Sequence, residues 1–530
     1  MKKQDTIVLI GFSVAGGIIS ALAWYPFYPG IVLLFSLVPF FILANHTDGS
    51  NERYGKRLLF IRVLPGFLAM NITALAWVRI AGIPLLITAI AGNTLIMAIT
   101  FWTGWLISNR PGRKYGSIFI IICWLAMEYA TNNIDIFSPW LNLGNGFAGE
   151  PGIIQWYEIT GVSGGTAWIL LSNAMLAEAL TAMMSDKCKT LIINRLILFL
   201  ITIALPPVLS LFMTPGTDKT DQSKAEILIV QPCSDPYEKK FTTPFIQQLE
   251  EVLEMAEPGI NNLTSWIITP ETTIDDPISL DSLNNNRYIT EIRKFLSGYP
   301  QAVFVLGATT LDQPPRKELH NSALMIPCEG KITWYHKSKL VPGIEKSFRG
   351  NFSLLQKIFP YLGGTDGGFT GQKSPSLLTH PSDGGSAAPV ICFESAFGGH
   401  VAGFLREGAQ FLVVMTNDGW WKGTAGYSQH LAFSSLRAIE TRRYVARAAN
   451  TGVSAIIAPD GKIIARLPWW EKGTISQTIT LSDRVTIYAR YGDIIGRMAL
   501  TVAIFMILIR FVAIPLRKRY SHFNQSGMQP

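Results

Sequence analysis

Long apolar stretches alternate with short polar ones over the first 215 residues, and one further apolar stretch lies near the end of the chain. A helix needs about 20 mostly apolar residues to cross a bilayer. The pattern therefore predicts a helical membrane bundle of eight spans. They cover residues 7–24, 28–45, 58–79, 85–107, 116–132, 163–183, 191–213 and 494–514.

The basic residues between these stretches predict the orientation of the bundle. They fall on one side, in the polar segments that hold Lys2 and Lys3, Arg53 to Arg57, Arg110 to Lys114, Lys187 and Lys189, and Arg517 to Arg519. The loop at 133–162 has neither lysine nor arginine and is placed on the other side. Cytoplasmic loops carry the excess of lysine and arginine, so both termini are expected in the cytoplasm and residues 215–490 outside it.

Between 222 and 490 short apolar runs alternate with amphipathic ones, which is typical of a layered α/β domain. Strands are predicted at 225–231, 266–269, 302–307, 389–392 and 411–415, helices near 243–257, 286–297, 398–407 and 428–442, and hairpins at 322–336 and around 459–461. The segment 343–388 is rich in glycine, serine and proline, and its length favours a lid. Three segments follow: a bundle at 1–215, a catalytic domain at 216–490, and a last span with a tail at 491–530.

Composition changes this picture little. Charged residues make up only 15% of the chain, against about 25% in soluble proteins. The net charge of +8 comes from basic residues at the ends of apolar runs, so it indicates topology and not a nucleic-acid partner. The five cysteines show no CxxC pairing, so neither a zinc site nor a disulfide framework is indicated. Glu128 and Glu178, inside predicted spans, are expected to form hydrogen bonds between helices.

Three predicted strands end in a reactive side chain: Glu271, Lys337 and Cys392. A thiol at the start of a helix can be activated, because nearby positive charge lowers the pKa of the thiol. A carboxylate can take its proton, and a cation can stabilise the oxyanion of a tetrahedral intermediate. These residue types together are suited to nucleophilic acyl transfer. Taken singly, a cysteine at a strand end is usually a small buried apolar residue.

The segments around these residues resemble the three signature blocks of the nitrilase superfamily: TPET at 269–272, YHKSKLVPGIE at 335–345 and ICFES at 391–395. The resemblance implies a nitrilase-like αββα sandwich, with Glu271 as general base, Lys337 as oxyanion stabiliser and Cys392 as nucleophile. Lys339 is the rival lysine, but Lys337 has the family's spacing of eight residues to a second glutamate, Glu345. Glu345, Glu394 and the backbone N–H of Phe393 are the implied supporting groups.

The chain as a whole resembles the apolipoprotein N-acyltransferases, a membrane family of bacterial lipoprotein maturation. The similar segments are PWLNLG at 139–144, GVSG at 161–164, VQP at 230–232, TNDGWW at 416–421, the block at 429–463 and TIYARYGD at 486–493. Phe241, Trp420 and Trp421 are the implied substrate contacts. Anchoring at the bilayer surface is an equal alternative for the two tryptophans.

This second resemblance implies a two-step transfer without metal or organic cofactor. A phospholipid acyl chain would pass through a thioester on Cys392 to the N-terminal amine of a diacylglyceryl-modified apolipoprotein. It also implies a monomer in the bacterial cytoplasmic (inner) membrane, with a periplasmic catalytic domain. Two alternatives remain: a membrane-tethered amidase, in which water resolves the thioester, and a transporter. Transporters usually have related halves, and here one large domain separates seven spans from one.

Overall fold

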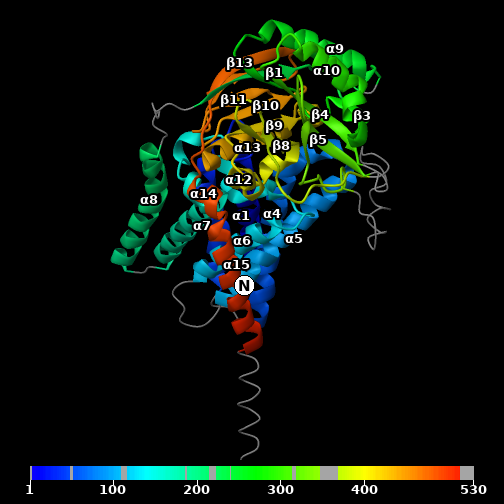
Figure 1. The fold of residues 1–530 in the computed structure, drawn as a ribbon. Coiled ribbons are helices and arrows are strands. Elements are labelled where there is room, and N and C mark those ends of the chain that lie inside the picture. Colours follow the sequence, from blue (N-terminus) through cyan, green and yellow to red (C-terminus); the bar gives the residue numbers. More distant parts are fainter. Residues whose placement is uncertain are drawn as a thin grey trace, which may run out of the picture.

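The computed structural model describes residues 3–47, 52–108, 116–185, 188–213, 223–238, 240, 242–312, 318–346, 368–382 and 384–513. A helical bundle carries a β-rich domain at one end, and α15 returns from that domain into the bundle (Figure 1). The bundle helices are α1 Lys3–Leu22, α2 Leu33–Ser36, α3 Val38–Thr47, α4 Glu52–Leu75, α5 Ile83–Ser108, α6 Gly116–Asn132, α7 Tyr157–Met184, α8 Lys189–Phe212 and α15 Ile494–Leu508.

Apolar helices lie at all eight predicted spans, but not all of these helices are long enough to cross a membrane. Five helices of the described chain are long and apolar enough to cross a membrane: Arg57–Ala81, Ile83–Ser108, Tyr157–Met184, Lys189–Phe212 and Ile494–Val512. The other three predicted spans correspond to shorter apolar helices, Thr6–Leu22, Gly30–His46 and Gly116–Asn132. The second of these is interrupted, because it consists of a 3₁₀ turn followed by α2 and α3.

The polar residues inside the bundle link helices, as the sequence predicts. Glu128 of α6 accepts hydrogen bonds from Trp124 Nε1 at 3.0 Å, Leu143 N at 2.9 Å and Thr166 Oγ1 of α7 at 2.7 Å. Glu178 of α7 pairs with Arg195 of α8 at 3.1 Å. These carboxylates therefore position helices and the PWLNLG loop, away from any reacting group.

Two stacked sheets form the centre of the β-rich domain. The first has the order β13-β1-β2-β4-β5-β6, with β3 paired to β4, and the second has the order β12-β11-β10-β9-β8-β7. Strands of the first sheet are β1 Lys224–Gln231, β2 Thr264–Ile268, β3 Ile274–Ser279, β4 Val303–Leu311, β5 Leu319–Pro327, β6 Thr333–His336 and β13 Gly473–Thr480. Those of the second are β7 Leu378–Thr379, β8 Ser386–Ile391, β9 Phe411–Thr416, β10 Val445–Ala449, β11 Ala455–Ile457 and β12 Ile463–Arg466.

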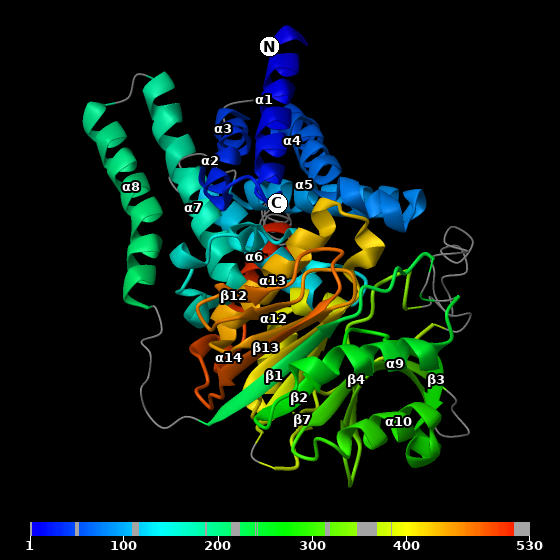
Figure 2. The same cartoon turned by 90° about the horizontal axis from the view of Figure 1, so that it is seen from above.

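Helices cover the outer face of each sheet, which gives the expected αββα order. The helices are α9 Phe245–Ala256, α10 Arg287–Leu296, α12 Gly398–Arg406, α13 Ala425–Thr441 and α14 Ile487–Tyr491. Seen from above, α9 and α10 lie on the outside of the first sheet, while α12 and α13 lie between the second sheet and the bundle (Figure 2). One apolar core separates the sheets and a second lies under α9 and α10.

The predicted strands and helices of this domain are present with ends shifted by a few residues, and four strands were missed: β3, β7, β10 and β13. β3, β10 and β13 have the sequences IDDPIS, VARAA and GTISQTIT, which carry charges, alanines or few apolar residues. β13 pairs with β1 along its whole length, from Lys224 opposite Thr480 to Gln231 opposite Gly473. Residues 347–367 and 383 of the expected lid lie outside the described residues.

The bundle and the domain share a third apolar core. Phe433, Leu436 and Ile439 of α13 belong to the same buried cluster as the helices of the bundle. At this junction Gln429 of α13 accepts a hydrogen bond from Trp140 Nε1 at 2.6 Å and donates to the carbonyl of Trp24 at 2.8 Å. In a soluble protein, the outer face of α13 would be exposed to water. Here that face packs on the helices of the bundle.

Candidate active site

The three strand ends singled out in the sequence meet between the sheets and the bundle. Glu271 follows β2, Lys337 follows β6 directly, and Cys392 follows β8 directly. Lys337 Nζ donates to Glu271 Oε1 at 2.9 Å, and the lysine and the glutamate are 1% and 7% exposed. Gly307 makes room for this arrangement, because a Cβ there would lie 2.1 Å from the carbonyl oxygen of Pro270.

Lys337 is held by two carboxylates. Its Nζ also donates to Glu345 Oε1 at 2.7 Å, and Glu345 Oε2 accepts from the backbone N–H of Val341 at 2.8 Å. Burial alone would lower the pKa of Lys337, but the carboxylates of Glu271 and Glu345 raise it well above its ordinary value. The site therefore contains a fixed ammonium group.

The rival lysine lies elsewhere. Lys339 Nζ donates to Asp135 at 3.0 Å, on the loop after α6, and the side chain is a quarter exposed. Of the two lysines in the YHKSK segment, only Lys337 contacts Glu271 and Glu345.

Cys392 occupies a strained position at the start of a short helix. Its φ is 51°, in the left-handed region that residues other than glycine seldom adopt. It is the first residue of the 3₁₀ helix Cys392–Ala396, as the predicted strand-to-helix position requires. Its carbonyl accepts from Ser395 Oγ and contacts His430 Nε2, both at 2.9 Å. The loop that carries the thiol is thus fixed from two sides.

The resting thiol is neutral. Burial and the neighbouring carboxylate of Glu271 raise the pKa of Cys392 above the ordinary range, and Lys337 offsets only part of this effect. Nucleophilic attack then needs a base within reach, since the thiolate is the reactive form. Among the carboxylates around the thiol, Glu271 has the largest electrostatic effect on Cys392 and is the candidate for this base.

Glu394 supports the loops around the site and does not face the cysteine. It is fully buried and joins the segment after β6 to the segment after β8. Its partners are Ile391 N at 2.8 Å, Ser338 N at 2.6 Å, Lys339 N at 3.1 Å and Tyr335 Oη at 2.6 Å.

An apolar cavity of about 290 Å³ opens onto Cys392 and Phe393. The bundle contributes Trp77, Trp140 and one side of α5, including Leu85, Ala89 and Gly92. The domain contributes Trp421 and the turn at 341–344. The ring of Trp421 packs on that of Trp77 at 4.7 Å between centroids.

The two implied tryptophan contacts therefore differ. Trp421 lines this cavity, while Trp420 is 39% exposed and its ring packs on Tyr237 at 5.4 Å. Phe241, the third implied contact, lies outside the described residues.

Sequence reasoning missed two groups beside Glu271. Asn321 Nδ2 donates to Glu271 Oε1 at 2.8 Å and to Glu345 Oε1 at 3.1 Å. Lys240 is buried, and Nζ donates to Thr272 Oγ1 at 2.6 Å. Burial lowers the pKa of Lys240 to about 8, against the opposing effect of Asp275 and Glu271. Neither residue lies in the blocks that suggested the site.

His430 is held in a buried network of hydrogen bonds and ion pairs. Its Nδ1 lies 2.7 Å from Asp418 Oδ1, and Arg447 Nη2 donates to Asp418 Oδ2 at 2.6 Å. Burial opposes the charge of Asp418, but Arg447 and His430 outweigh it and hold the pKa of this carboxyl well below its ordinary value. This buried triad connects α13 and the strands of the second sheet to the carbonyl of Cys392.

The chain matches two families of known proteins. Residues 217–488, just over half of the chain, match the carbon-nitrogen hydrolase family, and residues 16–175 match the N-terminal domain of apolipoprotein N-acyltransferases. The apolipoprotein N-acyltransferase of Chlorobaculum tepidum is 27% identical over 512 residues, which cover 92% of this chain and 94% of that protein. The Agrobacterium fabrum apolipoprotein N-acyltransferase is 29% identical over 506 residues, which cover 88% and 89%.

Solved structures similar to the chain include two members of the nitrilase superfamily. One, from Saccharomyces cerevisiae, has a TM-score of 0.37 at 14% identity and covers 54% of this chain and 97% of its own. The other, an amidase from Nesterenkonia, has a TM-score of 0.36 at 17% identity and covers 51% and 94%. By its family matches and its full-length relatives, the chain belongs to the apolipoprotein N-acyltransferases, membrane proteins of the nitrilase superfamily.

Proposed function

We propose that this protein transfers a phospholipid acyl chain, through a thioester on Cys392, to the N-terminal amine of a diacylglyceryl-modified apolipoprotein. The observation that carries the proposal is the cavity on Cys392, whose wall includes Leu85, Ala89 and Gly92 of a helix long enough to cross a membrane. An acyl chain leaving the bilayer would therefore reach the thiol along an apolar path. An apolar wall of this kind would not favour the binding of a small polar amide.

In the first step, Glu271 takes the proton of the Cys392 thiol as the sulfur attacks the ester carbonyl. The ammonium of Lys337 and the backbone N–H of Phe393 stabilise the oxyanion. The tetrahedral intermediate then releases the lysophospholipid oxygen, which receives the proton held by Glu271, and a thioester remains. Because the resting thiol is neutral, proton transfer and attack are coupled.

In the second step, the amine attacks the thioester, Glu271 accepts the amine proton, and the thiol is restored as the amide forms. Glu345 keeps Lys337 charged and in place throughout. Two indole N–H groups in the cavity wall, Nε1 of Trp77 and of Trp421, are buried and have no hydrogen-bond partner among the described residues. We assign them to oxygen atoms of the lipid ester or head group. Trp420, further out, is assigned to the head-group side, and Phe241 remains an expected contact.

The membrane arrangement is part of this proposal. All eight apolar helices are embedded in the membrane, both termini are cytoplasmic, and the domain at 216–490 faces the periplasm. The protein acts as a monomer. The support is the one-sided placement of lysine and arginine in the loops.

The test is intact-mass measurement of the detergent-solubilised protein after incubation with phospholipid, beside C392A. We expect a gain of one acyl chain that hydroxylamine removes and that C392A lacks. Adding a diacylated lipopeptide should discharge the chain onto its amine. Hydrolysis of a small amide by a protein that never gains an acyl chain would reject the transferase and favour the tethered amidase.

A further inference from the structure

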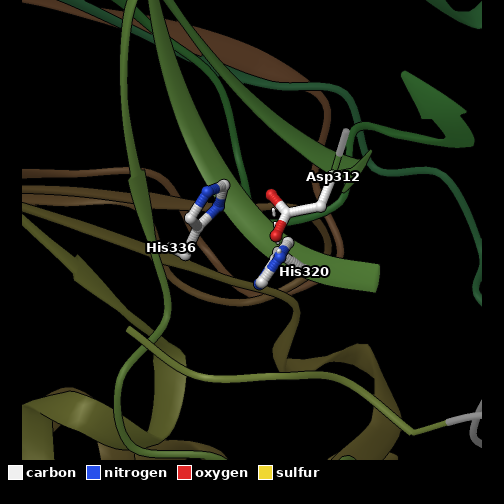
Figure 3. A group of neighbouring side chains, drawn as sticks. All are labelled: Asp312, His320 and His336. Carbon is white, nitrogen blue, oxygen red and sulfur yellow. Dashed lines mark ion pairs between the residues drawn. The ribbon is translucent and has the colours of Figure 1, made fainter. Parts of the chain in front are cut away.

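Asp312, His320 and His336 form a group of neighbouring side chains on the first sheet (Figure 3). Asp312 follows β4, His320 lies in β5 and His336 ends β6. The antiparallel register brings them together, since Thr310 is opposite His320 and Ser322 is opposite His336. One ligand atom from each side chain lies within 4.8 Å of the other two.

The hydrogen bonds of His320 leave one ring nitrogen facing a carboxylate. Its Nδ1 lies 2.7 Å from the carbonyl oxygen of Thr370, which can only accept, so Nδ1 carries a proton. Nε2 is 3.3 Å from Asp312 Oδ1 yet makes no hydrogen bond to any described residue, and His320 is only 5% exposed. In the neutral imidazole, two lone pairs would face each other there. A cation between them removes that repulsion.

His336 is anchored in the same manner. Its Nδ1 lies 2.7 Å from Ser322 Oγ, which lies 2.6 Å from Thr310 Oγ1. Its ring stacks on that of His320 with centroids 4.1 Å apart. Histidines that bind metals almost always use the second ring nitrogen in such an anchoring bond, which fixes the ring and its tautomer. His336 meets this condition in the tautomer that donates from Nδ1 to Ser322 Oγ and leaves Nε2 free for a ligand.

We propose that Asp312, His320 and His336 bind one divalent transition-metal ion, zinc by preference. Zinc takes imidazole and carboxylate ligands at about 2.0–2.1 Å in a tetrahedron, which separates ligand atoms by about 3.3 Å. The Asp312–His320 pair has that separation, at 3.3 Å, and the ligand atoms of the group all lie within 4.8 Å of one another. Water completes the four ligands, because Asp312 and His336 are partly exposed.

The ion would hold β5 and β6 together without touching the reacting atoms. Successive side chains of a strand point to opposite faces. Asn321 and Lys337, the residues after the two histidines, contact Glu271 on the catalytic side. The anchoring bond to Thr370 also ties the far end of the long loop to β5. Sequence spacing gave no sign of this site, because its ligands come from three strands and include no cysteine.

The experiment measures zinc in the full-length protein, purified in detergent without a polyhistidine tag, stripped with a chelator and reloaded with zinc chloride alone. After gel filtration, elemental analysis should find about one zinc per wild-type chain. H320A and the milder D312N should each weaken zinc binding by about tenfold or more. H46A, which removes an exposed histidine of α3, is the matched control and should bind as the wild type does.

Two further measurements test the proposed zinc site independently of acyl transfer. Zinc should raise the thermal unfolding midpoint of the wild type and of H46A but leave that of H320A unchanged, because only proteins that bind the ion gain stability from it. C392A should bind zinc normally, so a failure of the acyl-transfer proposal would not affect this measurement. Absence of zinc uptake by the wild type, or uptake by D312N and H320A equal to that of the wild type, would overturn the site.

Discussion

Asn321 donates from one amide group to two carboxylates, those of Glu271 and Glu345. In N321A these oxygens keep only Lys337, so Glu271 is less well aimed at the thiol. A lost hydrogen bond to a charged group costs roughly 1.5–3 kcal/mol, which corresponds to about a tenfold to hundredfold slower thioester formation with little change in KM. Single-turnover mass measurement gives the rate, and N285A, on the surface, is the matched control. Unchanged acylation by N321A would remove Asn321 from the positioning network.

Glu394 makes stability depend on pH. Burial alone would raise the pKa of this carboxyl, but His400 and the hydrogen bonds to the charged form outweigh burial and lower it. A lowered native pKa contributes stability that is complete above the unfolded value, near 4.5, and is lost as the pH falls through the native value. E394Q should therefore be less stable than the wild type at pH 7, by roughly 2–4 kcal/mol, and the difference should shrink on acidification.

Unfolding midpoints measured in detergent from pH 7 downwards would show this convergence. E407Q, which changes an exposed glutamate, should follow the wild type at every pH. A constant gap between E394Q and the wild type would mean that Glu394 is not charged in the folded protein.

At this scale the sequence predicted which side chains lie close together at the candidate site, but not their neighbours. Glu271, Lys337 and Cys392 could be found because each ends a strand inside a family block, and the spacing to Glu345 separated Lys337 from Lys339. Asn321 and Lys240 lie in other segments and reach Glu271 only through the fold. Their roles depend on the pairing of β5 with β6 and on a loop after β1, which no local pattern encodes.

Helix α5 supplies one side of the cavity, and Gly92 lies on that side with open space where a Cβ would be. In G92L the new side chain would occupy this space. Displacing two methylene groups of a bound chain costs about 1.6 kcal/mol, so transfer from a long-chain phospholipid should slow about tenfold while a short-chain donor is little affected. Acylation measured by intact mass with both donors distinguishes the cases.

Gly11 in α1 is the matched control, because it also has open space around a Cβ and does not line the cavity. G11L should therefore keep both rates. Equal slowing of long-chain and short-chain donors in G92L would mean that the acyl chain lies elsewhere.

Secondary structure was predictable where the apolar pattern is strong and local. The strand at β1 was found because it is a continuous apolar run buried on both faces, and the amphipathic helices α9 and α10 were found because each buries one regular face. β10 escaped detection because VARAA buries an arginine whose charge is met by Asp418. The apolar helices were placed correctly, but their lengths were not, since breaks such as the 3₁₀ turn before α2 leave no clear mark in composition.

The orientation of the whole molecule can be tested with a native cysteine. Cys188 is exposed between α7 and α8, next to Lys189, on the side assigned to the cytoplasm. A membrane-impermeant maleimide should leave it unlabelled in intact spheroplasts and label it after permeabilisation. The thiol introduced by D281C, on the surface of the domain, should be labelled in both. Peptide mapping identifies the labelled site, and labelling of Cys188 in intact spheroplasts would reverse the topology.

The shared core between α13 and the membrane helices has a consequence for how lipids act on this protein. Phe393, next to the nucleophile, belongs to the same buried cluster as the bundle residues Trp140 and Phe67. Helices adjust their tilt to the thickness of the bilayer. Because those helices and the loop of Cys392 pack in one cluster among the described residues, we expect a thinner or thicker membrane to shift the nucleophile itself and so to change the rate of the proposed reaction.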